Sequence, residues 1–296
     1  MVTIWTDEDL PGLIDAAGTV AVMRQALLAA HHGTLSAPPR VHAELGDGRL
    51  VYTAGATSSW FGYRSYDTIA GGDQLTVVHK RPSGAVAAIA LGADLGRMRT
   101  GAIGGLAAGE LAAPGASTVG IIGTGAHAWM QLWAINAVRP LTRVRVYSRT
   151  TERRERFAEH AAARYGIDVA AAASAEEAVS DAAIVVLATD SGTPVVDTDA
   201  IAPDAFVTTL GPKQAGRAEF DVRLAARAST VVTDSIAQLN AYDPPFVLVG
   251  TPHAERAVSL GAILAGEVTA PGPGVLFCSV GLAGTEAYLL AHLAGM

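Results

Sequence analysis

Several residue types that mark particular classes of protein are scarce in this chain. Its 296 residues include one cysteine, Cys278, which excludes an internal disulfide and suits a reducing compartment, so we expect a cytoplasmic protein. Lysine and arginine number 21 against 28 acidic residues, and the net charge of −7 argues against nucleic acid and against an anionic membrane as partners. No apolar run reaches the roughly 18 residues of a membrane span, and the N-terminus lacks the features of a signal peptide. The adjacent His31 and His32 have no further ligand at metal-binding spacing, so we expect no metal site.

Charged residues make up 17% of the chain and hydrophobic residues 50%, which predicts extensive burial. The length allows two domains with cores of their own. Residues 1–113 read as a first helix followed by hairpins, which predicts a mainly antiparallel α+β domain. Strands alternate with helices in 114–274, which predicts an α/β domain with a Rossmann-type, doubly wound parallel sheet that binds NAD(P). We expect 275–296 to join the first domain.

Residues 117–150 predict a dinucleotide-binding unit. Thr118 to Ile122 form a buried strand, Trp129 to Val138 a helix and Val144 to Tyr147 a second strand. The connecting turn consists of Gly123, Thr124, Gly125 and Ala126. Glycines let the backbone approach a pyrophosphate, which the helix N-terminus binds through its free N–H groups. The alternative is a tight turn that binds nothing.

The end of the second strand indicates which dinucleotide binds. An NAD site usually has an acidic residue there to accept from the ribose 2′-hydroxyl. Here the strand ends in Ser148, Arg149 and Thr150, which can bind a 2′-phosphate instead. We therefore expect NADP(H) in preference to NAD(H), although Arg149 alone could be an ordinary solvated arginine.

Later strand ends predict the other half of the nucleotide site. Ligands of parallel sheets bind at the carboxyl ends of the strands, where Thr189, Gly211 and Lys213 lie. In the first domain Arg40, Arg64 and Arg99 follow or interrupt apolar stretches. Arginine is seldom buried without an anion, so these three suit a small carboxylate substrate. Each taken alone could equally be a surface arginine.

Several motifs together resemble the ornithine cyclodeaminase/μ-crystallin family over almost the whole chain. They are Met98–Ala102, Val119–Gly125, Val146–Arg149, Pro194-Val195, Gly211–Glu219 and Phe277–Ala283. The resemblance implies a Rossmann domain, a sheet domain that forms a homodimer, and a nicotinamide cofactor. It also implies that Arg40 and Arg99 bind the substrate carboxylate, that Thr100 and residues 123–126 lie at the cofactor phosphates, and that Ser279 and Gly281 lie near the nicotinamide.

Three positions depart from the family pattern. Arg64 stands where the family has its active-site lysine, and arginine cannot easily relay a proton. Val51 replaces the acid that meets the distal amine of ornithine, and Lys213 replaces the catalytic aspartate of the cyclodeaminases. A lysine there repels a cationic intermediate, suits an anionic one, and could donate a proton. A surface role for Lys213 remains the alternative.

These departures favour an NAD(P)H-dependent reductase of a C=N bond beside a carboxylate, such as a cyclic ketimine or another imino acid reductase. In this hypothesis Arg40, Arg64 and Arg99 bind the carboxylate while Lys213 and Arg64 act in catalysis. The alternatives are an amino-acid dehydrogenase, an ornithine-cyclodeaminase-like enzyme, and a non-catalytic crystallin-like protein that binds NADP(H) or a ligand. The expected partners are a small imine or amino acid that bears a carboxylate, and a second copy of the chain.

Overall fold

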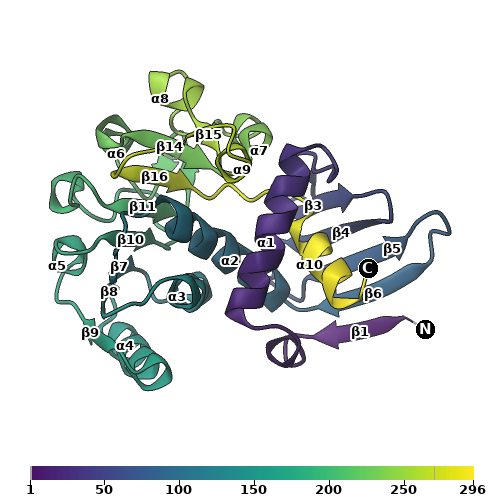
Figure 1. Cartoon of the computed structure of the whole chain (residues 1–296), viewed down its shortest axis with the longest axis horizontal. Coiled ribbons are helices and arrows are strands. Elements are labelled where there is room, and N and C mark those ends of the chain that lie inside the picture. The colour runs from purple at the N-terminus through teal and green to yellow at the C-terminus, as the bar shows by residue number, and fades with distance from the viewer. Residues whose placement is uncertain (1, 270) are drawn as a thin grey trace.

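The computed structural model describes residues 2–269 and 271–296, which form two sheets side by side (Figure 1). The smaller sheet runs in the order β1-β6-β5-β4-β3-β2 and is antiparallel except for the pair β1 and β6. Its strands are β1 (Thr3–Thr6), β2 (Val41–Glu44), β3 (Arg49–Ala56), β4 (Trp60–Asp67), β5 (Leu75–Lys80) and β6 (Val86–Leu91). This sheet confirms the predicted antiparallel α+β half.

One face of the smaller sheet is covered by the last helix, α10 (Thr285–Leu293), which packs against α1 (Ala16–His31). Two glycines of the smaller sheet allow α10 to approach it closely. A Cβ on Gly55 would lie 2.6 Å from Gly284 Cα, and one on Gly62 would lie 2.9 Å from Ala287 Cβ. Side chains alternate across a strand, so the neighbours of these glycines point away from α10.

The larger sheet is parallel throughout, in the order β15-β14-β16-β11-β10-β7-β8-β9. Its strands are β7 (Thr118–Ile122), β8 (Arg143–Tyr147), β9 (Asp168–Ala171), β10 (Ile184–Leu187), β11 (Phe206–Thr209), β14 (Thr230–Thr233), β15 (Val258–Ser259) and β16 (Val275–Cys278). A small hairpin, β12 (Lys213–Gln214) with β13 (Arg217–Ala218), follows β11.

Helices cover both faces of the larger sheet, which confirms the predicted doubly wound α/β fold. Ile184 and Val186 of β10 pack into the core with α2 (Asp94–Leu111), α3 (Ala126–Val138) and α4 (Thr151–Tyr165), whereas the alternate residues of β10 face a second core. The remaining helices are η1 (Leu10–Gly12), α5 (Ala175–Val179), η2 (Thr198–Ala200), α6 (Arg223–Arg227), α7 (Ile236–Asn240), α8 (Pro252–Glu255) and α9 (Leu260–Leu264).

The structure divides the segment 275–296, which the sequence assigned as a whole to the first domain. Strand β16 lies inside the larger sheet between β14 and β11, and only α10 reaches the smaller sheet (Figure 1). Four consecutive buried apolar residues, Val275–Cys278, are typical of an interior strand of a parallel sheet. The chain thus crosses from one sheet to the other at 279–284.

Helix α2 joins the two halves because it packs along α3 over most of its length. Glycines make the approach possible: a Cβ on Gly105 would lie 2.6 Å from Ala134 Cβ, and one on Gly104 would overlap the Gln131 side chain. The helix begins at Asp94, so Arg99 and Thr100 are helical and buried. Among the described residues no helix has both the length and the apolar character to cross a bilayer.

Candidate functional site

A cavity of about 560 Å³ opens where the two sheets meet, beside the carboxyl ends of the parallel strands. Its walls come from β4, α2, the start of α3 and the loops after β11 and β16. They include these residues predicted from the sequence: Arg40, Arg64, Arg99, Thr100, Ala126, Gly211, Lys213, Ser279 and Gly281. The described residues that line it include no aspartate or glutamate, so the cavity suits an anion.

Two of the arginines share one buried carboxylate. Arg64 Nη1 lies 2.8 Å and Arg99 Nη2 2.7 Å from the same oxygen, Oε1 of Glu286. Burial alone would raise the pKa of Glu286, but the charges of Arg99 and Arg64 outweigh it and lower this pKa to about 2. Gln74 accepts from Arg64 Nε at 3.0 Å. Both guanidinium groups are therefore held in fixed positions.

Glu286 escaped sequence reasoning because it lies near the start of an otherwise apolar helix. An acid inside an apolar helix is expected to be buried, and a buried carboxylate needs a charged partner. This pattern is the sequence signal by which Glu286 could have been identified.

The guanidinium groups of Arg40 and Arg99 both lie close to Gly281. A Cβ on Gly281 would lie 3.1 Å from Arg40 Nη2 and 3.6 Å from either terminal nitrogen of Arg99. Arg40 donates to the Val280 carbonyl through Nη2, while its buried Nε has no partner in the described part of the chain. An unpartnered buried donor beside two further guanidinium groups favours an anionic ligand at this point.

Lys213 is buried, with 2% of its surface exposed. Its Nζ donates to the Gly211 carbonyl at 2.6 Å, and no carboxylate of the described residues lies within ion-pair distance of it. The structure places it on the wall formed by the larger sheet, not on the outer surface. An ammonium group has three donors, so Lys213 has capacity left for a ligand.

Two further buried carboxylates shape the loops of the cavity. Glu219 accepts from the backbone N–H of Gly211 at 2.6 Å and of Thr189 at 2.9 Å, which ties together the ends of β11 and β10. Asp234 accepts from the N–H groups of Val280, Gly281 and Leu282 at 2.8 to 3.2 Å. Thr189, which was predicted to lie at the nucleotide site, does not line this cavity.

The glycine turn leaves the start of α3 open. Gly123 has φ +113°, and a Cβ there would overlap the Ala188 carbonyl, so only glycine fits. Gly125 is the N-cap of α3, with no side-chain cap and nothing within 4 Å of a Cβ placed on it. The first turn of α3 contains no acid. Its N–H groups therefore face open space and can bind a phosphate.

A second cavity, of about 410 Å³, lies on the other side of this turn and shares Ala126 with the first. It is lined by Thr124, Gly125, Ala126, Trp129, Arg153, Arg156, Phe157 and His160. The predicted Ser148, Arg149 and Thr150 line neither cavity. The Ser148 hydroxyl donates to the Thr150 carbonyl at 3.1 Å, and Arg149 is exposed.

His127 also lines the first cavity and was not singled out from the sequence. The side chain of His127 is partly exposed to solvent at the cavity, but protein atoms pack around most of the imidazole ring. Burial together with the charges of Arg99, Arg97 and Arg64 lowers the pKa of His127 to about 4, against a small opposite effect of Asp190. The imidazole is neutral at physiological pH.

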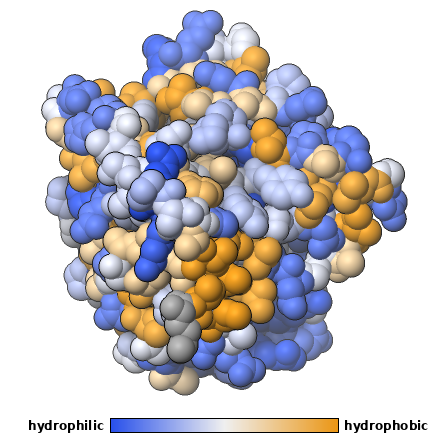
Figure 2. Space-filling view, turned by 90° about the vertical axis from the view of Figure 1, so that its right-hand side faces the viewer, coloured by the Kyte–Doolittle hydropathy of each residue, from blue (hydrophilic) through white to orange (hydrophobic). Residues whose placement is uncertain are grey.

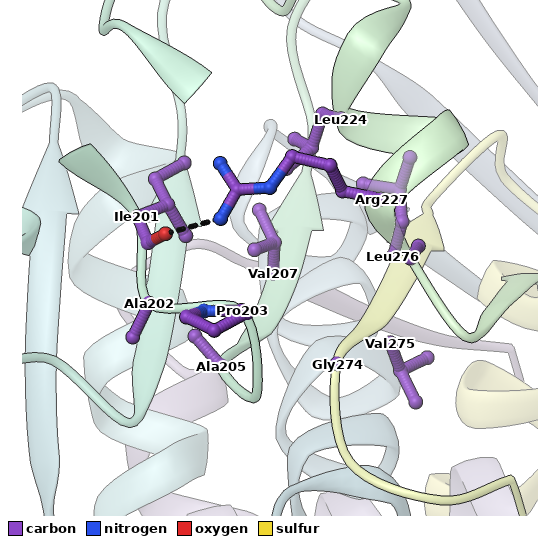
Figure 3. Close-up of a pocket in the computed structure, with 11 residues that line it drawn as sticks. Ile201, Ala202, Pro203, Ala205, Val207, Leu224, Arg227, Gly274, Val275 and Leu276 are labelled. Carbon is purple, nitrogen blue, oxygen red and sulfur yellow. Dashed lines mark hydrogen bonds between the residues drawn. The ribbon is translucent and has the colours of Figure 1, made fainter. Parts of the chain in front are cut away.

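Two other features carry no ligand argument. The cavity shown in Figure 3 has a volume of about 10 Å³ and holds one water at most. Aliphatic residues line it together with Arg227, which donates to the Ile201 carbonyl at 2.9 Å. On the surface, ligand atoms of His31, His32 and Glu267 lie within 4.8 Å of one another. The sequence spacing did not reveal this group, and its His31–Glu267 contact of 2.9 Å is an ordinary polar contact on the surface.

A parallel sheet with a glycine turn, and with cavities at the carboxyl ends of its strands, defines a Rossmann-type nucleotide-binding protein. The chain belongs to the ornithine cyclodeaminase/mu-crystallin family, whose model matches residues 13–290. This confirms the resemblance seen in the sequence.

Individual relatives differ in reaction. A Delta(1)-pyrroline-2-carboxylate reductase of Bacillus cereus is 34% identical over 49% of this chain and 44% of its own length. The chain thus spans less than half the length of this curated relative. An alanine dehydrogenase of Archaeoglobus fulgidus is 25% identical over 78% of this chain and 73% of its own.

Solved structures match over the whole fold. A probable ornithine cyclodeaminase from Bordetella pertussis Tohama I has a TM-score of 0.89 at 26% identity, covering 100% of this chain and 96% of its own. A Thermococcus litoralis Delta(1)-pyrroline-2-carboxylate reductase in complex with NADH and L-proline has a TM-score of 0.87 at 25% identity, covering 99% and 96%.

Proposed function

We propose that the protein is a nicotinamide-dependent oxidoreductase that reduces a C=N bond next to a carboxylate in a small imino acid. The observation that carries this proposal is the convergence of Arg40, Arg64 and Arg99 in one cavity with Lys213, beside an open dinucleotide turn. The similarity to reductases of Delta(1)-pyrroline-2-carboxylate supports it.

Each residue has a separate part in this proposal. A nicotinamide dinucleotide bound across residues 123–126 would supply the hydride. The arginines bind the substrate carboxylate and so orient the imine carbon, which is the main catalytic contribution we expect. Lys213, or a water that it orients, donates a proton to the substrate nitrogen as its C=N bond becomes a C–N bond. Glu286 holds Arg64 and Arg99 in place, and Asp234 does the same for the loop that carries Ser279 and Gly281.

The charge of the cavity argues against the cyclodeaminase alternative. That reaction passes through a cationic intermediate and recognises a second amine, both of which need a carboxylate in the cavity. Lys213 and the buried Val51 stand where the family has those acids. Oxidation of an amino acid uses the same groups in reverse, and the similarity to an alanine dehydrogenase favours it as the second candidate.

The proposal also covers the cofactor and the oligomeric state. We assign NADP(H) as the preferred cofactor and a homodimer as the assembly. The face of the smaller sheet turned away from α10 carries exposed apolar residues, and Figure 2, which looks onto the end of the molecule that contains this sheet, shows apolar side chains gathered there. Ile4, Phe61 and Leu91 are exposed there, next in sequence to residues that face the core. A second copy would cover this surface.

The test is oxidation of NADPH and NADH in the presence of Δ1-pyrroline-2-carboxylate, Δ1-piperideine-2-carboxylate, or pyruvate with ammonia, with ornithine and NAD as the control. Turnover of a ketimine supports the reductase, and K213M should then lower kcat by roughly a hundredfold or more. Nucleotide binding without turnover of any substrate would contradict the reductase and favour a binding protein.

A further inference from the structure

The second cavity has a basic wall made by one face of α4. Arg153, Arg156 and His160 are three and four residues apart, so they lie on the same side of the helix. All three line the cavity, opposite Thr124 and Gly125 of the glycine turn. We call them the α4 basic face.

Acidic residues adjoin this face without pairing with it. Glu152 and Glu159 lie four and three residues from Arg156, on the neighbouring side of α4. In the described part of the chain neither Arg153 nor Arg156 takes part in an ion pair, and no aspartate or glutamate lines the cavity. Two guanidinium groups beside free helix N–H groups form a site for an anion.

The position of the cavity decides which anion. A dinucleotide that crosses the glycine turn places its two halves on opposite sides of Ala126. The first cavity contains the substrate arginines and must receive the reacting half. The α4 cavity, which lies between the glycine turn and α4, therefore receives the adenosine half.

We propose that Arg153 and Arg156, with His160 at the far end, bind the 2′-phosphate of the adenosine ribose and so select NADP(H). This inference rests on the proposed function only in requiring that a dinucleotide binds across the turn. It moves the cofactor-selecting residues from 148–150, which lie outside the cavity, to the first two turns of α4.

The test compares two ligands that differ in one phosphate, adenosine 2′,5′-bisphosphate and adenosine 5′-monophosphate, as well as NADPH and NADH. Dissociation constants are measured by calorimetry for the wild type, R153Q, R156Q and a control, R164Q. Arg164 lies in the last turn of the same helix, outside the cavity, and its loss changes the charge by the same amount. Circular dichroism verifies that each variant is folded.

We expect R153Q and R156Q each to weaken NADPH and the bisphosphate by about tenfold, with NADH, the monophosphate and R164Q almost unchanged. An equal loss for both members of each pair would overturn the inference, because the arginines would then serve the pyrophosphate that both dinucleotides share. Unchanged affinities would overturn it as well. Selective binding of the bisphosphate by a protein that reduces no imine would leave this inference standing and contradict the reductase alone.

Discussion

At the residue scale, the site depends on three buried carboxylates that do not touch the cavity. Glu286 binds two arginines, Glu219 ties two strand ends together, and Asp234 holds the loop after β16. Each satisfies several donors at once, so each fixes its neighbours more rigidly than a single hydrogen bond would. The walls of the cavity are thereby preorganised for an anion before it binds.

Replacing Glu286 should separate positioning from folding. E286Q leaves Arg64 and Arg99 without their shared charge, so we expect a higher KM for the imino acid and a loss of about 3 kcal/mol of stability. Kinetics and urea unfolding measure the two effects. The exposed Glu255 provides the control, because E255Q should change neither. A normal KM in folded E286Q would show that the arginines do not need this carboxylate.

The same residue predicts an acid-dependent loss of stability. The pKa of Glu286 lies at about 2 in the folded protein, below its ordinary value of 4.5. Its contribution is therefore fully present above about pH 4.5 and is lost as the pH falls towards 2. Stability should fall less steeply in this window for E286Q than for the wild type.

His127 predicts a pH effect in a higher window. The pKa of His127 is about 4 in the folded protein, below its ordinary value of 6.5. Between pH 6.5 and pH 4 the imidazole is therefore protonated in the unfolded chain but neutral in the folded protein. Stability contributed by the neutral imidazole is thus present above pH 6.5 and lost on acidification. Unfolding of the wild type and H127Q across this range measures it. Identical slopes for the two proteins would contradict the lowering of the His127 pKa by burial and by the nearby arginine charges.

At the scale of elements, the packing of α2 on α3 sets the distance between the two halves of the site. Helix α2 carries Arg99 and Thr100, while the first turn of α3 carries the phosphate-binding N–H groups. The two helices can approach closely only because Gly101, Gly104 and Gly105 present no side chain.

Two alanine substitutions in α2 should have opposite signs. A Cβ on Gly105 would lie 2.6 Å from Ala134 Cβ, so G105A should destabilise the protein by about 1–3 kcal/mol. A Cβ on Gly109 meets nothing nearer than 3.5 Å, so G109A should stabilise by roughly 0.5–1 kcal/mol through helix propensity. Urea denaturation tests both, and stabilisation by G105A would mean that the helices are not in this close contact.

Elements with a local signal could be predicted from the sequence, and those set by distant contacts could not. The strand–glycine turn–helix unit at 118–138 was recognisable because turn chemistry and hydrophobic period agree there. The extent of α2 has no such local signal, because its glycines have low helix propensity and tertiary packing overrides that propensity. Strand β16 was assigned to the other half because the sequence around 275–278 does not show which strands it joins. The α4 basic face became evident only when the glycine turn was seen opposite it.

At the scale of the whole molecule, the exposed apolar face of the smaller sheet predicts a homodimer. Light scattering after gel filtration should give twice the mass of the chain for the wild type and a smaller mass for F61K, because a lysine on this face must be desolvated on association. V249K changes an apolar residue that is 51% exposed in the other half of the molecule and should remain dimeric. A monomeric wild type would contradict the proposed assembly.

The two sheets together make a cavity that neither makes alone, with the carboxylate-binding arginines on one side and the dinucleotide turn on the other. The claim that these arginines orient an imino acid is tested most directly by a matched pair of substrates, Δ1-pyrroline-2-carboxylate and Δ1-pyrroline, which differ only in the carboxylate. With saturating NADPH we expect rapid oxidation of the cofactor with the first and roughly a hundredfold less with the second, from the loss of charge-assisted hydrogen bonds to the arginines. Equal rates with the two imines, or no reduction of either, would contradict this function.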